Sequence, residues 1–183
     1  MSNNNNNNKH YVMVYGTLKR GGGLHQALQT ADFVQESLLS GYKLLNLGGC
    51  PGLVAGTNDE HVVGEIYKVD EDTLQDLDRI EGHPVMYTRT EILLPIDLGE
   101  RGSFTCLYVY IYNTLEEDNS WYTPYDITLL PTVVNEAVGT VYMWSTRGHN
   151  GYRSEETVSE LGMSVPTIGI VHSSITGAAE ARV

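Results

Sequence analysis

The chain has 183 residues, which is enough for one domain, or one domain with an appendage, and for a core without a disulfide or a structural metal. Hydrophobic residues make up 41% of it, and this share argues against wholesale disorder. The formal net charge of −12 argues against non-specific binding to nucleic acids and against docking on anionic membranes.

Targeting and membrane signals are missing from the sequence. No N-terminal segment resembles a signal peptide, and no apolar run reaches the roughly 18 residues that span a bilayer. The two cysteines, Cys50 and Cys106, have no close spacing, so we expect free thiols in a cytoplasmic protein. Because the asparagine run over 3–8 cannot bury apolar surface, residues 1–9 are expected to form a disordered leader.

The first strong pattern is the apolar run over residues 11–15, which predicts a buried central strand that ends at Gly16. A cluster of glycines follows, with Lys19 and Arg20 directly before it. The next expected elements are a short helix, a strand, a turn and a second strand, over residues 24–28, 37–47, 50–52 and 62–69.

The clearest helix is expected over residues 70–81. Asp70 can cap its N-terminus, acidic residues fill its first turn, and Gly82 suits its C-terminal cap. Its apolar stripe consists of Leu74, Leu77 and Ile80. Strands are expected over 87–94 and 107–112, and in the second strand tyrosines alternate with aliphatic residues, which predicts one aromatic face.

The order of these elements predicts an α+β domain over residues 10–126. The pattern weakens beyond this point, although 133–144 has strand character and 164–173 is apolar. Residues 127–183 are therefore expected to form an extension of unknown role that packs on the domain.

Motifs for nucleotides, metals and nucleophilic catalysis are missing. Gly21 follows Gly16 at P-loop spacing, but Gly22 and Gly23 stand where Lys and Ser or Thr are required. The chain has no Gly-x-Gly-x-x-Gly at the strand end, no His pair with metal-ligand spacing and no Gly-x-Ser-x-Gly elbow. We therefore expect no metal. A cysteine nucleophile stays open, although the positions of both cysteines favour structural roles.

Glu81 is the remaining candidate for proton transfer. The twelve residues from Asp70 to Glu81 carry six carboxylates and one arginine, and Glu81 lies at the negative end of the helix dipole. Both effects raise the pKa of this carboxyl, which is the direction that general acid–base work near neutrality requires. The alternative is a solvated surface glutamate.

Several separated stretches, in order and at matching spacing, resemble the gamma-glutamyl cyclotransferase-like family. Tyr-Gly-Thr-Leu-Lys over 15–19 resembles the opening motif of this family, in the form closest to its gamma-glutamylamine cyclotransferase branch. Residues 63–67, 77–82 and 87–89 resemble the family's strand, its helix ending in the catalytic glutamate, and its Tyr-x-Arg strand. The similarity covers roughly 11–126. Two departures are Leu24-His25, where the family has Asn-His, and Cys50, where a tyrosine is common.

The resemblance implies a small mixed barrel-like sheet with flanking helices and a cavity at the end of the first strand. It also implies that a small gamma-glutamyl substrate is bound by backbone N–H groups, which are those of Tyr15, Gly16, Thr17 and Leu18. Glu81 is then the general acid and base, and no cofactor takes part. The possible pocket residues are Tyr87, Arg89, Tyr108 and Tyr110.

The implied reaction closes the gamma-glutamyl group on itself to give 5-oxoproline and a free amine. A binding module without turnover and an interaction protein remain alternatives, and the leaving amine and the oligomeric state stay open. Lys19 and Arg20 either attract the substrate over a distance or are solvated, and we favour the second. Arg89 pairs either with a carboxylate that fixes the loop or with a surface acid.

Overall fold

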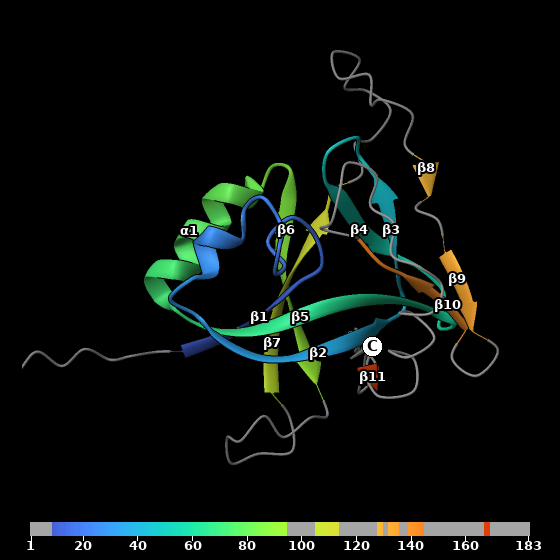
Figure 1. The fold of residues 1–183 in the computed structure, drawn as a ribbon, viewed down its shortest axis with the longest axis horizontal. Helices are drawn as coiled ribbons and strands as arrows, with labels where there is room; N and C mark the ends of the chain where they lie inside the picture. Colours follow the sequence, from blue (N-terminus) through green and yellow to red (C-terminus); the bar gives the residue numbers. More distant parts are fainter. Residues whose placement is uncertain are drawn as a thin grey trace, which may run out of the picture.

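The computed structural model describes residues 9–94, 105–113, 128–129, 132–135, 139–144 and 167–168. Within these residues, strands form a large mixed sheet and a small one, with one α-helix packed on the large sheet (Figure 1). The elements are β1 (Lys9–Val14), η1 (His25–Leu28), β2 (Asp32–Ser40), β3 (Tyr42–Asn46), β4 (Pro51–Ala55), β5 (Glu60–Asp70), α1 (Glu71–Glu81), β6 (Tyr87–Leu94), β7 (Thr105–Tyr112), β8 (Thr128–Leu129), β9 (Thr132–Asn135), β10 (Gly139–Tyr142) and β11 (Thr167–Ile168).

Strand β1 lies inside the larger sheet, as its apolar run predicts. The strand order is β11-β2-β5-β1-β7-β6, and β10 also pairs with β5. β1 is antiparallel to β5 and parallel to β7, so both of its edges are hydrogen-bonded. The side chains of residues 11–14 are buried, because neighbouring elements cover both faces of the strand.

The smaller sheet covers one face of the larger sheet. Its order is β4-β3-β8; β3 contacts β5, and β4 contacts β7. Enclosed between the two sheets is an apolar cluster that includes Met13, Leu44, Leu53, Ile66 and Val109. This enclosed mixed sheet confirms the α+β, barrel-like fold class that the resemblance implies.

A second apolar cluster joins α1 and the short 3-10 helix η1 to the other face of the large sheet (Figure 1). Val12 and Val14 supply it from β1, and Leu74 and Leu77 supply it from α1. Ile80, expected in the same stripe, is 41% exposed. From Leu74 to Ile80 there are two steps of three residues, which together rotate the side-chain direction by about 120° around the helix axis. Ile80 therefore points away from the sheet.

The ends of α1 match the sequence prediction. The Asp70 carboxylate accepts a hydrogen bond from the Thr73 N–H at 2.9 Å, as an N-cap does. Gly82 closes the helix in the left-handed conformation with φ 62°. The C-terminus of the helix, where Glu81 lies, is therefore defined by the Gly82 cap.

Two other predicted boundaries were wrong. The strand expected over 37–47 is two strands, because Gly41 has a φ of 82° and turns the chain between β2 and β3. The turn expected at 50–52 lies earlier: the Leu47 N–H donates to the Cys50 carbonyl, and Pro51 already belongs to β4. The aromatic face expected on β7 is confirmed, since its leucine and valine lie in the inner cluster and its tyrosines in the outer one.

The segments described beyond residue 126 pair with the domain: β8 with β3, β10 with β5 and β11 with β2. Residues 1–8 of the expected leader lie outside the described residues, and Lys9 is the first residue of β1. The proposed domain boundaries remain predictions. In the described ranges, no helix is both long enough and apolar enough to cross a membrane.

Candidate active site

A pocket opens at the C-terminal end of β1, between the loop that follows it and the end of α1. It is lined by residues 13–18, Cys50, Pro51, Glu81, Tyr87 and Tyr110, and holds about 310 Å³ of space not filled by protein, its open mouth included. Glu81 and the 15–18 segment, 63 residues apart in sequence from Leu18 to Glu81, therefore share one pocket. This is the juxtaposition that acid–base chemistry at the loop requires.

The loop after β1 is closed by hydrogen bonds to its own carbonyl groups. The Lys19 N–H donates to the Gly16 carbonyl at 3.1 Å, and the Leu24 N–H donates to the Thr17 carbonyl at 3.1 Å. The Nδ1 of His25 lies 2.9 Å from the Leu18 carbonyl and donates to it. None of the bonds found in the described part of the chain uses the N–H group of Gly16, Thr17 or Leu18 as donor, so the loop offers donors at the pocket.

Two of the loop glycines are required by close packing. A Cβ on Gly16 would lie 2.8 Å from Cγ of Pro51, so this glycine lets the loop pack on β4, in addition to the expected approach of a ligand. A Cβ on Gly22 would lie 2.1 Å from the Thr17 carbonyl oxygen. A Cβ on Gly23 would meet nothing within 4 Å.

Of the two basic residues beside the glycines, Lys19 is buried, which corrects the favoured expectation that it is solvated, whereas the Arg20 side chain is 50% exposed but anchored. Glu65 on β5, only 5% exposed, accepts a hydrogen bond from the Arg20 backbone N–H at 2.9 Å and another from its Nε at 3.2 Å. The Tyr67 hydroxyl donates to the same carboxylate at 2.7 Å. The Arg20 guanidinium also lies 4.0 Å above the Phe33 ring, and Lys19 is only 8% exposed. The loop is thus fastened to β5 directly after its pocket segment.

Burial raises the pKa of Glu81 from 4.5 to about 7. The direction expected from the sequence is confirmed, but the cause is loss of water around the carboxyl and not the other acidic residues of the helix. In the described part of the chain, no group donates a hydrogen bond to this carboxyl. Glu81 is therefore neither solvated at the surface nor satisfied by protein donors.

Tyrosines form the walls beside Glu81. The Tyr15 hydroxyl donates to the Tyr110 carbonyl at 2.6 Å, and the Tyr87 hydroxyl donates to the Pro51 carbonyl at 3.0 Å. Burial, and then the nearby charge of Glu81, raise the pKa of Tyr15 well above its ordinary range. These tyrosines are therefore hydrogen-bonded, neutral wall residues near neutral pH.

The four possible pocket residues divide into two pairs. Tyr87 and Tyr110 line the pocket, whereas Arg89 and Tyr108 are not among its lining residues. The Arg89 guanidinium lies 4.9 Å from the Tyr108 ring and pairs with Asp78 at 2.6 Å. The partner of Arg89 is thus a partly buried carboxylate on the helix of Glu81, and it is neither on the loop nor a fully exposed surface acid.

Sequence reasoning missed Cys50, Glu65 and Asp78. Cys50 was interpreted as structural, yet it lines the pocket, and its Sγ lies 3.6 Å from the Tyr87 hydroxyl. Glu65 carried one signal, since it is an acidic residue inside an apolar strand. Among the residues described, no cluster of His, Cys, Asp or Glu is placed to hold a metal ion.

Residues 12–126 match the family described as gamma-glutamyl cyclotransferase, AIG2-like. A putative gamma-glutamylcyclotransferase of Vibrio cholerae is 41% identical over 105 residues, which cover 57% of this chain and 83% of that protein. A gamma-glutamylaminecyclotransferase of Bos taurus is 35% identical over 124 residues, covering 62% of this chain and 71% of that protein. A solved AIG2-like protein of Mus musculus has a TM-score of 0.49 and 28% identity, over 66% of this chain and 88% of that chain.

Relatives with both kinds of name match, so the gamma-glutamylamine branch is not singled out. The family match covers more than half of the chain and contains every residue that lines the pocket. The chain belongs to the gamma-glutamyl cyclotransferase, AIG2-like family.

Proposed function

We propose that this protein cyclises gamma-glutamyl-amines, or closely related gamma-glutamyl conjugates, to 5-oxoproline with release of the amine. The observation that carries the proposal is the position of Glu81 in one pocket with residues 15–18, the donor loop, which follows β1. Family membership and the Bos taurus relative named for gamma-glutamylamines support the choice of substrate class.

The reaction joins two groups of the same substrate. The substrate's alpha-amine attacks its own gamma-carbonyl carbon, a C–N bond closes the five-membered ring, and the C–N bond to the leaving amine then breaks. Glu81 takes a proton from the alpha-ammonium before attack and passes it to the departing nitrogen. The ring nitrogen loses its second proton after the ring has closed, and the amine leaves as its ammonium ion, so two protons move in all from the ring nitrogen to the leaving amine. A carboxyl with a pKa of about 7 exists in both protonation states near neutral pH, so it can perform both transfers.

The loop supports the oxyanion that forms at the gamma-carbonyl. The N–H groups of Gly16, Thr17 and Leu18 make no bond among the described residues, so they can donate to the substrate's oxygens. The loop is held by its own hydrogen bonds and by Glu65 before the substrate arrives, and preorganised donors are the condition for strong stabilisation of a developing charge. Folding the substrate back on itself is a matter of positioning, which the hydrogen-bonded pocket walls supply.

The test measures 5-oxoproline release from a panel of gamma-glutamyl-amines, including gamma-glutamyl-lysine derivatives, gamma-glutamyl dipeptides and glutathione. Glu81→Gln removes the proton carrier at constant shape and should lower kcat by about a hundredfold or more. Glu71→Gln, an exposed change on the same helix, is the matched control and should retain full turnover.

Unchanged turnover in Glu81→Gln would remove Glu81 from the mechanism. Binding of gamma-glutamyl compounds without any 5-oxoproline release by the wild type would show a binding module in place of an enzyme.

A further inference from the structure

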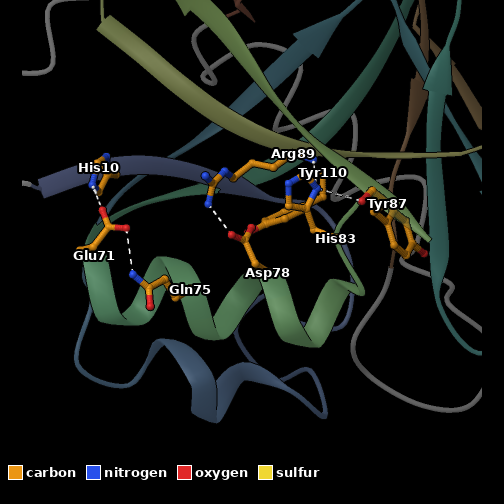
Figure 2. A network of polar contacts seen from close by, with 8 residues as sticks. All are labelled: His10, Glu71, Gln75, Asp78, His83, Tyr87, Arg89 and Tyr110. Carbon is orange, nitrogen blue, oxygen red and sulfur yellow. Dashed lines mark hydrogen bonds and ion pairs between the residues drawn. The ribbon is translucent and has the colours of Figure 1, made fainter. Parts of the chain in front are cut away.

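The carboxylate of Asp78 joins three elements around the pocket (Figure 2). It belongs to α1; its Oδ2 pairs with Nη1 of Arg89 on β6 at 2.6 Å, and its Oδ1 accepts the hydroxyl of Tyr110 on β7 at 2.8 Å. The Asp78 and Arg89 side chains are only 22% and 25% exposed. This group, the Asp78 cluster, consists of Asp78, Arg89 and Tyr110.

The Asp78 cluster is linked to both sides of the pocket. Asp78 precedes Glu81 by three residues, so it lies on the last turns of the helix that ends in that acid. Tyr110 lines the pocket itself, and its carbonyl accepts the Tyr15 hydroxyl at 2.6 Å. Two hydrogen bonds that share Tyr110 therefore connect the helix of Glu81, through β7, with Tyr15.

Arg89 holds the end of α1 a second time, through its backbone. The residue after the Gly82 cap is His83, whose N–H donates to the Asp78 carbonyl at 2.9 Å. Nδ1 of His83 accepts the Arg89 backbone N–H at 3.1 Å (Figure 2). The final turn of the helix is thus fixed to β6 by the side chain of Arg89 and also by its peptide group.

We propose that Asp78 and Arg89 are positioning residues, which hold the last turn of α1 against β6 and β7 so that the Glu81 carboxyl stays inside the pocket, opposite the donor loop. The kinetic part of this inference rests on the proposed function. Neither residue lines the pocket, so both act through Glu81 and Tyr110.

A second ion pair on the same helix supplies the contrast. Arg79 pairs with Asp76 three residues earlier, and their side chains are 72% and 59% exposed. Both belong to α1, so this pair cannot fasten the helix to the sheet, and an exposed pair within one helix stabilises by only about 0.5 kcal/mol. The two Asp–Arg pairs therefore separate the effect of tethering from the effect of charge.

The first readout is turnover per folded molecule. Asp78→Asn and Arg89→Met should each lower kcat by about tenfold or more, because a misplaced proton carrier affects the chemical step. KM should change by less than about threefold, since the loop that binds the substrate is unchanged. The controls Asp76→Asn and Arg79→Met should behave as the wild type in both constants.

The second readout does not need turnover: the titration midpoint of Glu81 is followed by carbon-13 NMR of labelled glutamate. Burial raises the pKa of this carboxyl to about 7, so a released helix end should expose it to water and lower the midpoint. Arg89→Met decides the cause, because loss of a positive charge alone would raise the midpoint, whereas loss of the tether lowers it. The other groups around Glu81 are Tyr15, Cys50 and Tyr87, with His83 close in sequence, and they are the same in all variants.

A raised or unchanged midpoint in Arg89→Met, or a kcat equal to that of Arg79→Met, would overturn the positioning role. If Arg89→Met does not fold, Tyr110→Phe removes one hydroxyl from the Asp78 cluster and should give the same two effects at smaller size. A wild type that releases no 5-oxoproline would refute the proposed function, while the NMR titration would still decide whether the Asp78 cluster positions Glu81.

Discussion

Two glutamates near the pocket are shielded from water, and their surroundings differ. Glu65 on β5 is 5% exposed and receives three hydrogen bonds, two from Arg20 and one from Tyr67. Glu81 at the end of α1 loses water as well, but no group in the described ranges donates to it, and burial raises its pKa to about 7. Both carboxyls are thus shielded from water, but within the described segments only Glu65 has hydrogen-bond donors around it.

The difference indicates which acid is structural and which one is available for the proton transfer that we propose. A buried carboxylate that accepts several hydrogen bonds fixes the donor groups around it. A carboxyl without donors keeps its proton near neutral pH and can exchange it with a ligand. In this protein, Glu65 fastens the donor loop, and we propose that Glu81 transfers protons to what the loop binds.

The largest expected effect concerns how the stability of the protein depends on pH when Glu81 is present and when it is replaced. Below pH 4.5 the carboxyl is protonated in the folded and the unfolded chain. Between pH 4.5 and about 7 the unfolded chain releases the proton first, so the stability of the wild type falls as pH rises and is constant above this range. Glu81→Gln lacks this loss, so its stability relative to the wild type should increase by on the order of 3 kcal/mol between pH 4 and pH 8. Urea unfolding at both pH values measures the difference, and an equal offset at both would contradict the burial of Glu81.

The next effect tests whether the loop depends on its glycines. Gly22→Ala should destabilise the protein by roughly 2 to 3 kcal/mol, because its Cβ would lie 2.1 Å from the Thr17 carbonyl oxygen. It should also raise KM, since Thr17 belongs to the donor segment. Gly23→Ala is the matched control, because its Cβ would meet no atom within 4 Å. Thermal unfolding and KM for 5-oxoproline release check both variants, and equal behaviour of the two would show that the loop adapts freely.

A smaller effect is expected when Glu65 loses its charge. In Glu65→Gln, an amide NH2 group can face the N–H donors of Arg20, and Arg20 loses its charged, buried partner. This should lower the free energy of unfolding by about 2 kcal/mol. Because the donor loop loosens, KM should rise more than kcat falls. Glu36→Gln removes only the exposed side of the Arg20 contact and should cost less than about 0.5 kcal/mol. Urea unfolding with steady-state kinetics measures both, and a kcat defect without a KM change would place Glu65 with the acid side of the pocket.

The smallest effect separates the two tyrosines that donate to carboxylates. Tyr67→Phe and Tyr110→Phe each remove one hydroxyl donor and should each cost about 1 kcal/mol. Their kinetic effects should differ: Tyr67→Phe acts on the loop and changes KM, whereas Tyr110→Phe acts on the helix of Glu81 and changes kcat. The two constants measured side by side check this, and the same change in both variants would mean that the two anchors are not independent.

Local patterns predicted much of the fold. The apolar run of β1, the caps of α1 and the alternation in β7 each depend on residues next to one another, so the chain itself reveals them. The strand break at Gly41 and the drift of Ile80 were missed, because a positive φ and an uncovered helix face depend on what packs nearby. The residues of the pocket could be listed in part from the family motifs, but Cys50 could not, since a loop from another hairpin brings it there.

The sequence by itself determined the central strand, the capped helix ending in Glu81 and the motifs of the family, because each is written in neighbouring residues. Only the tertiary structure decided the cause of the raised pKa of Glu81, the partner of Arg20 and the partner of Arg89. Burial and pairing are properties of contacts between distant segments, here β5 with the loop and α1 with β6 and β7. A carboxylate's neighbours in the chain therefore say little about its neighbours in space.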